Sequence, residues 1–350
     1  MSTTRATPRI PIDAIEELVA QRYVSVQKHP TADLYIYNYT PKAAWEKRWT
    51  PETRMCRGLI LDGAGNVVQR PFEKFFNWGD PAAGPIPLDE PFEVYEKVDG
   101  SLGILHWAEA EPALATRGSF TSTQAVQGTR ILREQYGHTW AGLERRLTYL
   151  FEIIYPLNRI VVDYGRREDI VLLAVIETAT GRDLSLGGFE SLGFPVVERH
   201  DGVTDFRELA EVQASNREGY VVKFASGLRL KIKLEEYVRL HRLVTGVTHR
   251  RIWEALRMGI PLATLKDTAS ADYRQWVDDV AAEIQGRYRA IEDEARRDFK
   301  DLGDRKANAL YYATCRHPAV LFRMLDGRPY DDVIWRLVRP EQSSPFKVEV

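Results

Sequence analysis

Short apolar or alternating runs dominate the first two thirds of the chain. Runs of this length, bounded by turn residues such as Gly and Asp-Gly, predict β-strands. Helical spacing of apolar residues predicts a helix over 12–24. Helices are also expected over 122–136 and 140–149, the second followed by a strand near 148–154. The predicted strands lie in LYIYNY (34–39), GLILDGAGNVV (58–68), PFEVYEKV (91–98), DIVLLAVIET (169–178), GYVVKF (219–224) and LRLKIKL (228–234).

From about residue 236 the apolar residues follow a helical period instead. Spacings of three and four from Trp276 to Phe299 predict one long amphipathic helix, and shorter helices are expected over 249–258, 306–316 and 317–326. The predicted fold class is α+β, with an antiparallel-sheet domain over residues 1–245 and a smaller all-helical domain over residues 246–350.

Composition limits the classes of partner and compartment. The 350-residue chain carries 48 basic and 50 acidic side chains, so a nucleic-acid partner would need a local basic patch. Its two cysteines, Cys56 and Cys315, lie too far apart to suggest a metal site. The sequence shows neither a signal peptide nor an apolar run of roughly 18 residues, so we expect no membrane span and a cytoplasmic location.

The segment EKVDGSLGIL (96–105) has two interpretations. Val94 to Val98 and Leu102 to Leu105 can form a β-hairpin, since Asp99-Gly100 suits a tight type I′ turn, and Lys97 would then be a solvated side chain. Alternatively, Lys97 is a nucleophile. The segment by itself does not decide between them.

Five other positions carry charge on or beside predicted strands. Lys231 and Lys233 alternate with apolar residues and therefore share one face, which indicates either an anion between them or a solvated outer face. Glu152 and Glu218 have apolar neighbours and need partners, which can be arginines, ribose hydroxyls or hydrated magnesium. Arg57 directly precedes Gly58 and an apolar strand.

In combination these residues indicate nucleotidyl transfer. A lysine amine can attack the α-phosphorus of a nucleoside triphosphate once it has lost its proton, and its reference pKa is ~10.4. Neighbouring cations and burial lower the pKa of an amine, and the same cations stabilise the transferred phosphate and the departing pyrophosphate.

The chain resembles the phage T4 RNA ligase 1 family of covalent nucleotidyltransferases. EKVDGSL matches the Lys-x-Asp-Gly-Ser nucleophile motif of that superfamily, and the resemblance extends over residues 35–241. It rests on YIYNYTPKAAW (35–45), CRGLIL (56–61), RPFEKFFNWGD (70–80), KVDGSL (97–102), TRGS (116–119), FEIIYPLNRIVVDY (151–164), EGYVVKF (218–224) and LKIKLEEYVRLH (230–241).

The resemblance implies an ATP-dependent RNA ligase with a nucleotidyltransferase domain of the ATP-grasp-like ligase type. Lys97 would be the adenylated nucleophile, Glu218 would hold the metal, and Asp99 and Gly100 would shape the turn. Ser101 would contact a phosphate. Arg117 stands where the family usually has lysine, so a planar guanidinium replaces a compact ammonium group. The expected ATP-site residues are Tyr37, Arg57, Lys74, Glu152, Lys231, Lys233 and Tyr237.

The cofactors implied are ATP, with AMP covalently bound to Lys97, and Mg²⁺, with Mn²⁺ as a substitute. The partners implied are RNA ends bearing a 5′-phosphate and a 3′-hydroxyl, with cleaved tRNA as one candidate, joined by a monomer in RNA repair. mRNA capping and DNA ligase chemistry are alternatives, but both usually append an OB-fold where this chain is predicted to be helical. A catalytically inactive RNA-binding repair factor is the non-enzymatic alternative.

Overall fold

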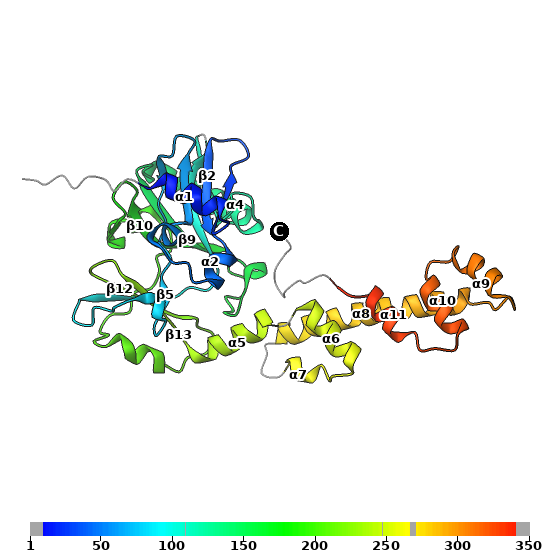
Figure 1. Ribbon diagram of the computed structural model, residues 1–350. Helices are drawn as coiled ribbons and strands as arrows, with labels where there is room; N and C mark the ends of the chain where they lie inside the picture. The colour runs from blue at the N-terminus through cyan, green and yellow to red at the C-terminus, as the bar shows by residue number, and fades with distance from the viewer. Residues whose placement is uncertain (1–9, 109, 247, 267–270, 341–350) are drawn as a thin grey trace, which may run out of the picture. The chain divides into compact units, whose positions relative to one another are not determined.

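The computed structural model describes residues 10–108, 110–246, 248–266 and 271–340 (Figure 1). The chain divides into two compact units, the first ending at Val238 and the second beginning at Arg239. The division falls inside helix α5 (Glu235–Gly246). The domain boundary predicted from the sequence, between residues 245 and 246, lies at the end of the same helix. Within the described residues, no helix combines the length and the apolar character needed to cross a membrane.

Three β-sheets form the first unit. The first has the strand order β1-β2-β3-β4, the second β11-β10-β9-β7-β8 and the third β5-β13-β12-β6. All strand pairs are antiparallel except β13 with β5, which is a short parallel pair. The strands are β1 (Val24–Lys28), β2 (Leu34–Tyr39), β3 (Arg57–Asp62), β4 (Val67–Gln69), β5 (Phe76–Asn77), β6 (Phe92–Glu96), β7 (Ser101–Ala108), β8 (Glu111–Ala115), β9 (Leu147–Ile154), β10 (Asp169–Glu177), β11 (Arg182–Leu184), β12 (Gly219–Phe224) and β13 (Arg229–Lys233).

Helices cover the sheets at their apolar faces. α4 begins after Ser122, whose hydroxyl accepts a hydrogen bond from the N–H of Ala125, and packs on the second sheet. A β-carbon at Gly128 of α4 would lie 2.7 Å from Ile153 Cδ1, so glycine permits this close approach. The α-helices of this unit are α1 (Ile12–Ala20), α2 (Pro41–Trp45), α3 (Pro51–Met55) and α4 (Thr123–Tyr136), and the 3₁₀ helices are 81–83, 137–142, 156–158, 186–188, 190–192 and 206–211.

Two predicted helices differ from the structure. The helix expected over 12–24 ends at Ala20, because Arg22 adopts φ 63° and Val24 starts β1 opposite Tyr39. The helix expected over 140–149 is wrong, because residues 137–142 form a 3₁₀ helix and β9 already begins at Leu147. The strand expected near 148–154 is confirmed, since β9 lies between β10 and β7 and is buried along almost its whole length.

Helices α6 to α11 make up the rest of the second unit. α8 is the long amphipathic helix that the sequence predicts, and its Val277, Ile284 and Ala295 lie in an apolar core shared with the shorter helices. The class predicted for the chain, α+β with antiparallel sheets followed by a helical region, is confirmed. The helices are α6 (His249–Met258), α7 (Ala263–Lys266), α8 (Ala271–Asp298), α9 (Arg305–Tyr312), α10 (Pro318–Leu325) and α11 (Asp331–Leu337).

Candidate active site

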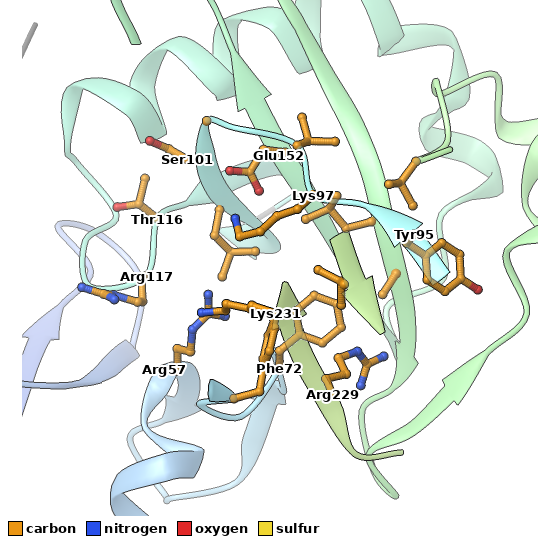
Figure 2. Close-up of a pocket in the computed structure, with 18 of the residues that line it drawn as sticks. Arg57, Phe72, Tyr95, Lys97, Ser101, Thr116, Arg117, Glu152, Arg229 and Lys231 are labelled. Carbon is orange, nitrogen blue, oxygen red and sulfur yellow. The ribbon is translucent and has the colours of Figure 1, made fainter. Parts of the chain in front are cut away.

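A cavity of about 540 Å³ opens between the second and third sheets (Figure 2). β6, β12 and β13 of the third sheet line one side, and β7, β9, β10 and β11 of the second sheet line the other. Of the residues that the sequence assigns to a site, those lining this cavity are Arg57, Lys97, Gly100, Ser101, Arg117, Glu152 and Lys231.

Lys97 lies in the connection between two sheets. β6 belongs to the third sheet and β7 to the second, so the hairpin interpretation of EKVDGSLGIL is wrong. The backbone N–H of Lys97 donates to the carbonyl of Gly219 at 2.8 Å. Its Nζ donates to Glu218 Oε2 at 2.7 Å, across 121 residues of sequence. The backbone of this connection is therefore held in place, and Lys97 lines the cavity.

Asp99 anchors this connection. Its side chain is only 3% exposed. Oδ2 accepts hydrogen bonds from the N–H groups of Val161 and Val162, both at 2.9 Å, and Oδ1 accepts one from the Tyr237 hydroxyl at 2.8 Å. Both Asp99 and Tyr237 thus hold the backbone that carries Lys97, and neither lines the cavity.

The two residues after Asp99 also fit closely. A β-carbon at Gly100 would lie 2.6 Å from the carbonyl oxygen of Ile153, so the connection cannot pass β9 here with a larger side chain. The hydroxyl of Ser101 donates to Asn158 Oδ1 at 3.1 Å.

Lys231 and Lys233 share one face of β13, as their spacing predicts, while Leu230 and Ile232 are buried on the other. Lys233 pairs with Glu218 Oε1 at 2.8 Å, so each carboxylate oxygen of Glu218 contacts one ammonium group. Burial by itself would raise the pKa of Glu218, but Lys97 and Lys233 outweigh it and lower that pKa. Lys231 has no such carboxylate among the residues that the structure describes, and burial together with Arg57 and other cations lowers its pKa to about 6.

Arg57, Arg117 and Glu152 are the other charged residues from the sequence predictions that line the cavity. Burial lowers the pKa of Arg57, whose Nη1 is buried without a hydrogen-bond partner in the described part of the chain. Arg117 Nη1 donates to the Tyr39 hydroxyl at 2.9 Å. Burial raises the pKa of Glu152 to about 8, and the nearby carboxylates of Glu218 and Asp99 add to this effect. Among the described residues, Arg57, Arg117 and Lys231 thus form no ion pair with a carboxylate.

Tyr37 and Lys74 lie outside this lining. The ring of Tyr37 packs against the apolar cluster beneath α1, although its neighbour Asn38 lines the cavity. Lys74 lines a second cavity, and its Nζ donates to the carbonyl of Phe75 at 3.1 Å. Burial and the charge of Arg57 lower the pKa of Lys74 to about 8.

The family described as RNA ligase, of the T4 RNA ligase 1 type, matches residues 55–237, which is more than half of the chain. This stretch contains the Lys97 connection, Glu152, Glu218 and both lysines of β13. The chain belongs to the RNA ligase family.

Named relatives of this RNA ligase family member include a putative RNA ligase of Thermovibrio ammonificans, 30% identical over 248 residues that cover 66% of this chain and 64% of that protein. An RNA ligase of Rhodothermus phage RM378 is 25% identical over 63% of this chain and 66% of that protein. The chain thus spans less than two thirds of either relative. An archaeal ATP-dependent RNA ligase of solved structure aligns over 92% of this chain and 97% of that chain, with 15% identity and a TM-score of 0.47.

Several residues that line the cavity of this RNA ligase family member were not predicted from the sequence. Arg229 lies two positions before Lys231, so the period of the strand could have found it. Tyr95 likewise lies two positions before Lys97. Asp183 pairs with both Arg229 and Lys223 at the cavity wall, and no sequence signal marks that contact because it joins separate sheets.

Proposed function

We propose that this protein is an ATP-dependent RNA ligase that works through a covalent lysyl-AMP intermediate. The arrangement that carries the proposal is the Lys97 amine in a cavity of a chain that belongs to the RNA ligase family. The same cavity is lined by Arg57, Arg117 and Lys231, which form no ion pair among the described residues. The Lys97 amine attacks the α-phosphorus of ATP, a nitrogen–phosphorus bond forms, and pyrophosphate leaves. A 5′-phosphate oxygen of RNA then takes the AMP, and a 3′-hydroxyl finally displaces AMP to seal the strand.

The cations suit a triphosphate. Arg57 and Lys231 are both destabilised by burial in the free protein, and an anionic phosphate chain would reverse that penalty for each of them. Arg117, in the segment after β8, has a planar guanidinium that suits a phosphate group. Phosphoryl-type transfer needs mainly positioning and charge stabilisation, which these side chains supply.

Glu218 has two roles in this proposal. In the free protein its carboxylate accepts hydrogen bonds from Lys97 and Lys233 and so holds both amines in place. A divalent ion such as Mg²⁺ or Mn²⁺ prefers oxygen ligands, and Glu218 and Glu152 offer carboxylates beside the cavity, so this donor set fits it. When bound, such an ion would neutralise charge on the leaving pyrophosphate.

The proposed substrates are RNA ends with a 5′-phosphate and a 3′-hydroxyl, and the proposed role is RNA repair, with cleaved tRNA as a candidate. Support comes from membership of the RNA ligase family. The family match ends at residue 237 and does not include the helical unit. A monomeric state and a cytoplasmic location remain predictions from the sequence.

The test is covalent labelling. The protein is incubated with α-phosphate-labelled ATP or GTP and magnesium, denatured and separated by electrophoresis. We expect label from ATP, and we expect Lys97→Ala to abolish it. Lys28→Ala, which changes an exposed lysine on β1, is the matched control and should label normally. Label from GTP alone would point to capping chemistry. No label from either nucleotide, in protein free of bound AMP, would refute the proposal.

A further inference from the structure

A second cavity of about 490 Å³ adjoins the first. Phe72, Phe75, Asp183 and Arg229 line both cavities and form the wall between them. Figure 2 shows Phe72 and Arg229 at the side of the first cavity away from Lys97. The second cavity therefore lies across the proposed nucleotide site from the attacking amine.

The second cavity carries uncompensated positive charge. Arg54, Arg70 and Lys74 line it, and none of them forms an ion pair within the described part of the chain. Of its two carboxylates, Asp183 is already paired with Arg229. The other, on Glu73, is exposed and opposes only part of this charge, through its electrostatic interaction with Arg70.

One N–H donor there has no hydrogen-bond partner among the described residues. Arg54 Nε is buried and has no acceptor among the described residues. Arg70 uses its Nε to donate to the carbonyl of Thr178 at 2.9 Å, which fixes the guanidinium at the cavity wall. A buried donor without an acceptor is costly, so the arrangement favours an anionic ligand that accepts from Arg54.

The same cavity offers aromatic surface. Phe72, Phe75 and Phe76 line it, and the rings of Phe72 and Phe75 meet edge to face rather than stacking on each other. Phe76 is almost completely buried and packs against Trp49. Bases stack on aromatic side chains without regard to their sequence. The volume lies within the ~300–1,000 Å³ typical of sites for small ligands. Cations and rings together match a nucleotide rather than a bare phosphate.

We propose that the second cavity binds the 5′-terminal nucleotide of the RNA, with Arg54 and Arg70 contacting its phosphate and the phenylalanine rings contacting its base. This inference rests on the proposed function. In the AMP-transfer step an oxygen of the RNA 5′-phosphate bonds to the phosphorus of lysyl-AMP, the bond from phosphorus to Lys97 Nζ breaks, and its electron pair returns to the amine. Attack in line with the leaving nitrogen requires the RNA phosphate to approach from the side opposite Lys97.

The experiment separates this step from the first one. Protein already converted to lysyl-AMP is mixed with excess 5′-phosphorylated oligoribonucleotide without ATP, and RNA-adenylate is followed in a single turnover. We expect Arg54→Met and Arg70→Met to slow AMP transfer to RNA at least tenfold more than they slow lysyl-AMP formation. Arg54→Lys, which keeps the charge, should recover part of the loss. Arg133→Met, which changes an exposed arginine paired with Glu111, is the matched control.

Binding gives a second readout that a merely structural role would not change. The lysyl-AMP protein should prefer 5′-phosphorylated over 5′-hydroxyl RNA of the same sequence, and both methionine variants should lose most of that preference. Folded variants that keep the wild-type preference and transfer rate would overturn the inference. If the wild type forms no lysyl-AMP at all, the proposed function fails first, and that result is visible before RNA is added.

Discussion

Lys231 provides a quantitative test of the nucleotide site, because its charge should depend on whether a triphosphate is bound. With its pKa lowered to about 6, its amine is largely neutral in the free protein at pH 7.5. A group with that pKa is ~3% protonated at pH 7.5, so a phosphate chain that restores an ordinary lysine pKa would draw in ~1 proton.

The perturbation is Lys231→Arg. Arginine supplies the positive charge that Lys231 carries when nucleotide is bound, and it is protonated in both the free and the bound protein. The substitution therefore removes only the proton uptake on binding. Other groups that titrate near this pH, Lys74 and Glu152 at about 8, are present in both proteins. The difference between the two proteins should therefore isolate Lys231 at ~1 proton per nucleotide bound.

The assay is isothermal titration calorimetry at pH 7.5 in buffers of different ionisation enthalpy. The ligand is an ATP analogue with a methylene bridge between the α- and β-phosphorus, which cannot release pyrophosphate. Because binding takes up a proton, the affinity of the wild type should fall by ~tenfold per pH unit above pH 7 relative to the variant. Equal proton uptake in wild type and Lys231→Arg would refute the reasoning that an uncompensated Lys231 awaits a phosphate.

Two further predictions concern the frame of the site. Asp99→Ala leaves two backbone N–H groups and the Tyr237 hydroxyl without their acceptor, so it should lower the free energy of unfolding by ~3–6 kcal/mol in urea denaturation, against ~1 kcal/mol for Tyr237→Phe. Equal losses would contradict the anchoring role. Gly58→Ala, at φ 94° with its β-carbon 2.3 Å from Ile104 Cδ1, should displace Arg57 and raise the KM for ATP in lysyl-AMP formation. An unchanged KM would show that Arg57 is not positioned by Gly58.

The sequence by itself determined the local features of this protein. The strands over 34–39 and 219–224 match their predicted bounds, because their apolar residues lie between clear turn residues. Period two placed Lys231 and Lys233 on one face of a strand, since side chains alternate in any extended backbone. Local spacing was likewise enough to predict the long helix α8.

Only the tertiary structure decided how these elements meet. The helix expected over 140–149 does not form, because its last residues belong to β9 and pair with the neighbouring strand β10. Asp99-Gly100 suits a hairpin turn, yet the strands on either side pair with different sheets, and Asp99 instead accepts from residues more than 60 positions away.

The site depends on the same long-range choices. Glu218 meets Lys97 across 121 residues, and the wall between the two cavities joins β11, β13 and the segment before β5. Strand pairing is selected by burial and hydrogen bonding over the whole sheet, which no local pattern encodes. The sequence therefore supplied the charged residues, and the packing of the sheets determined which of them share a cavity.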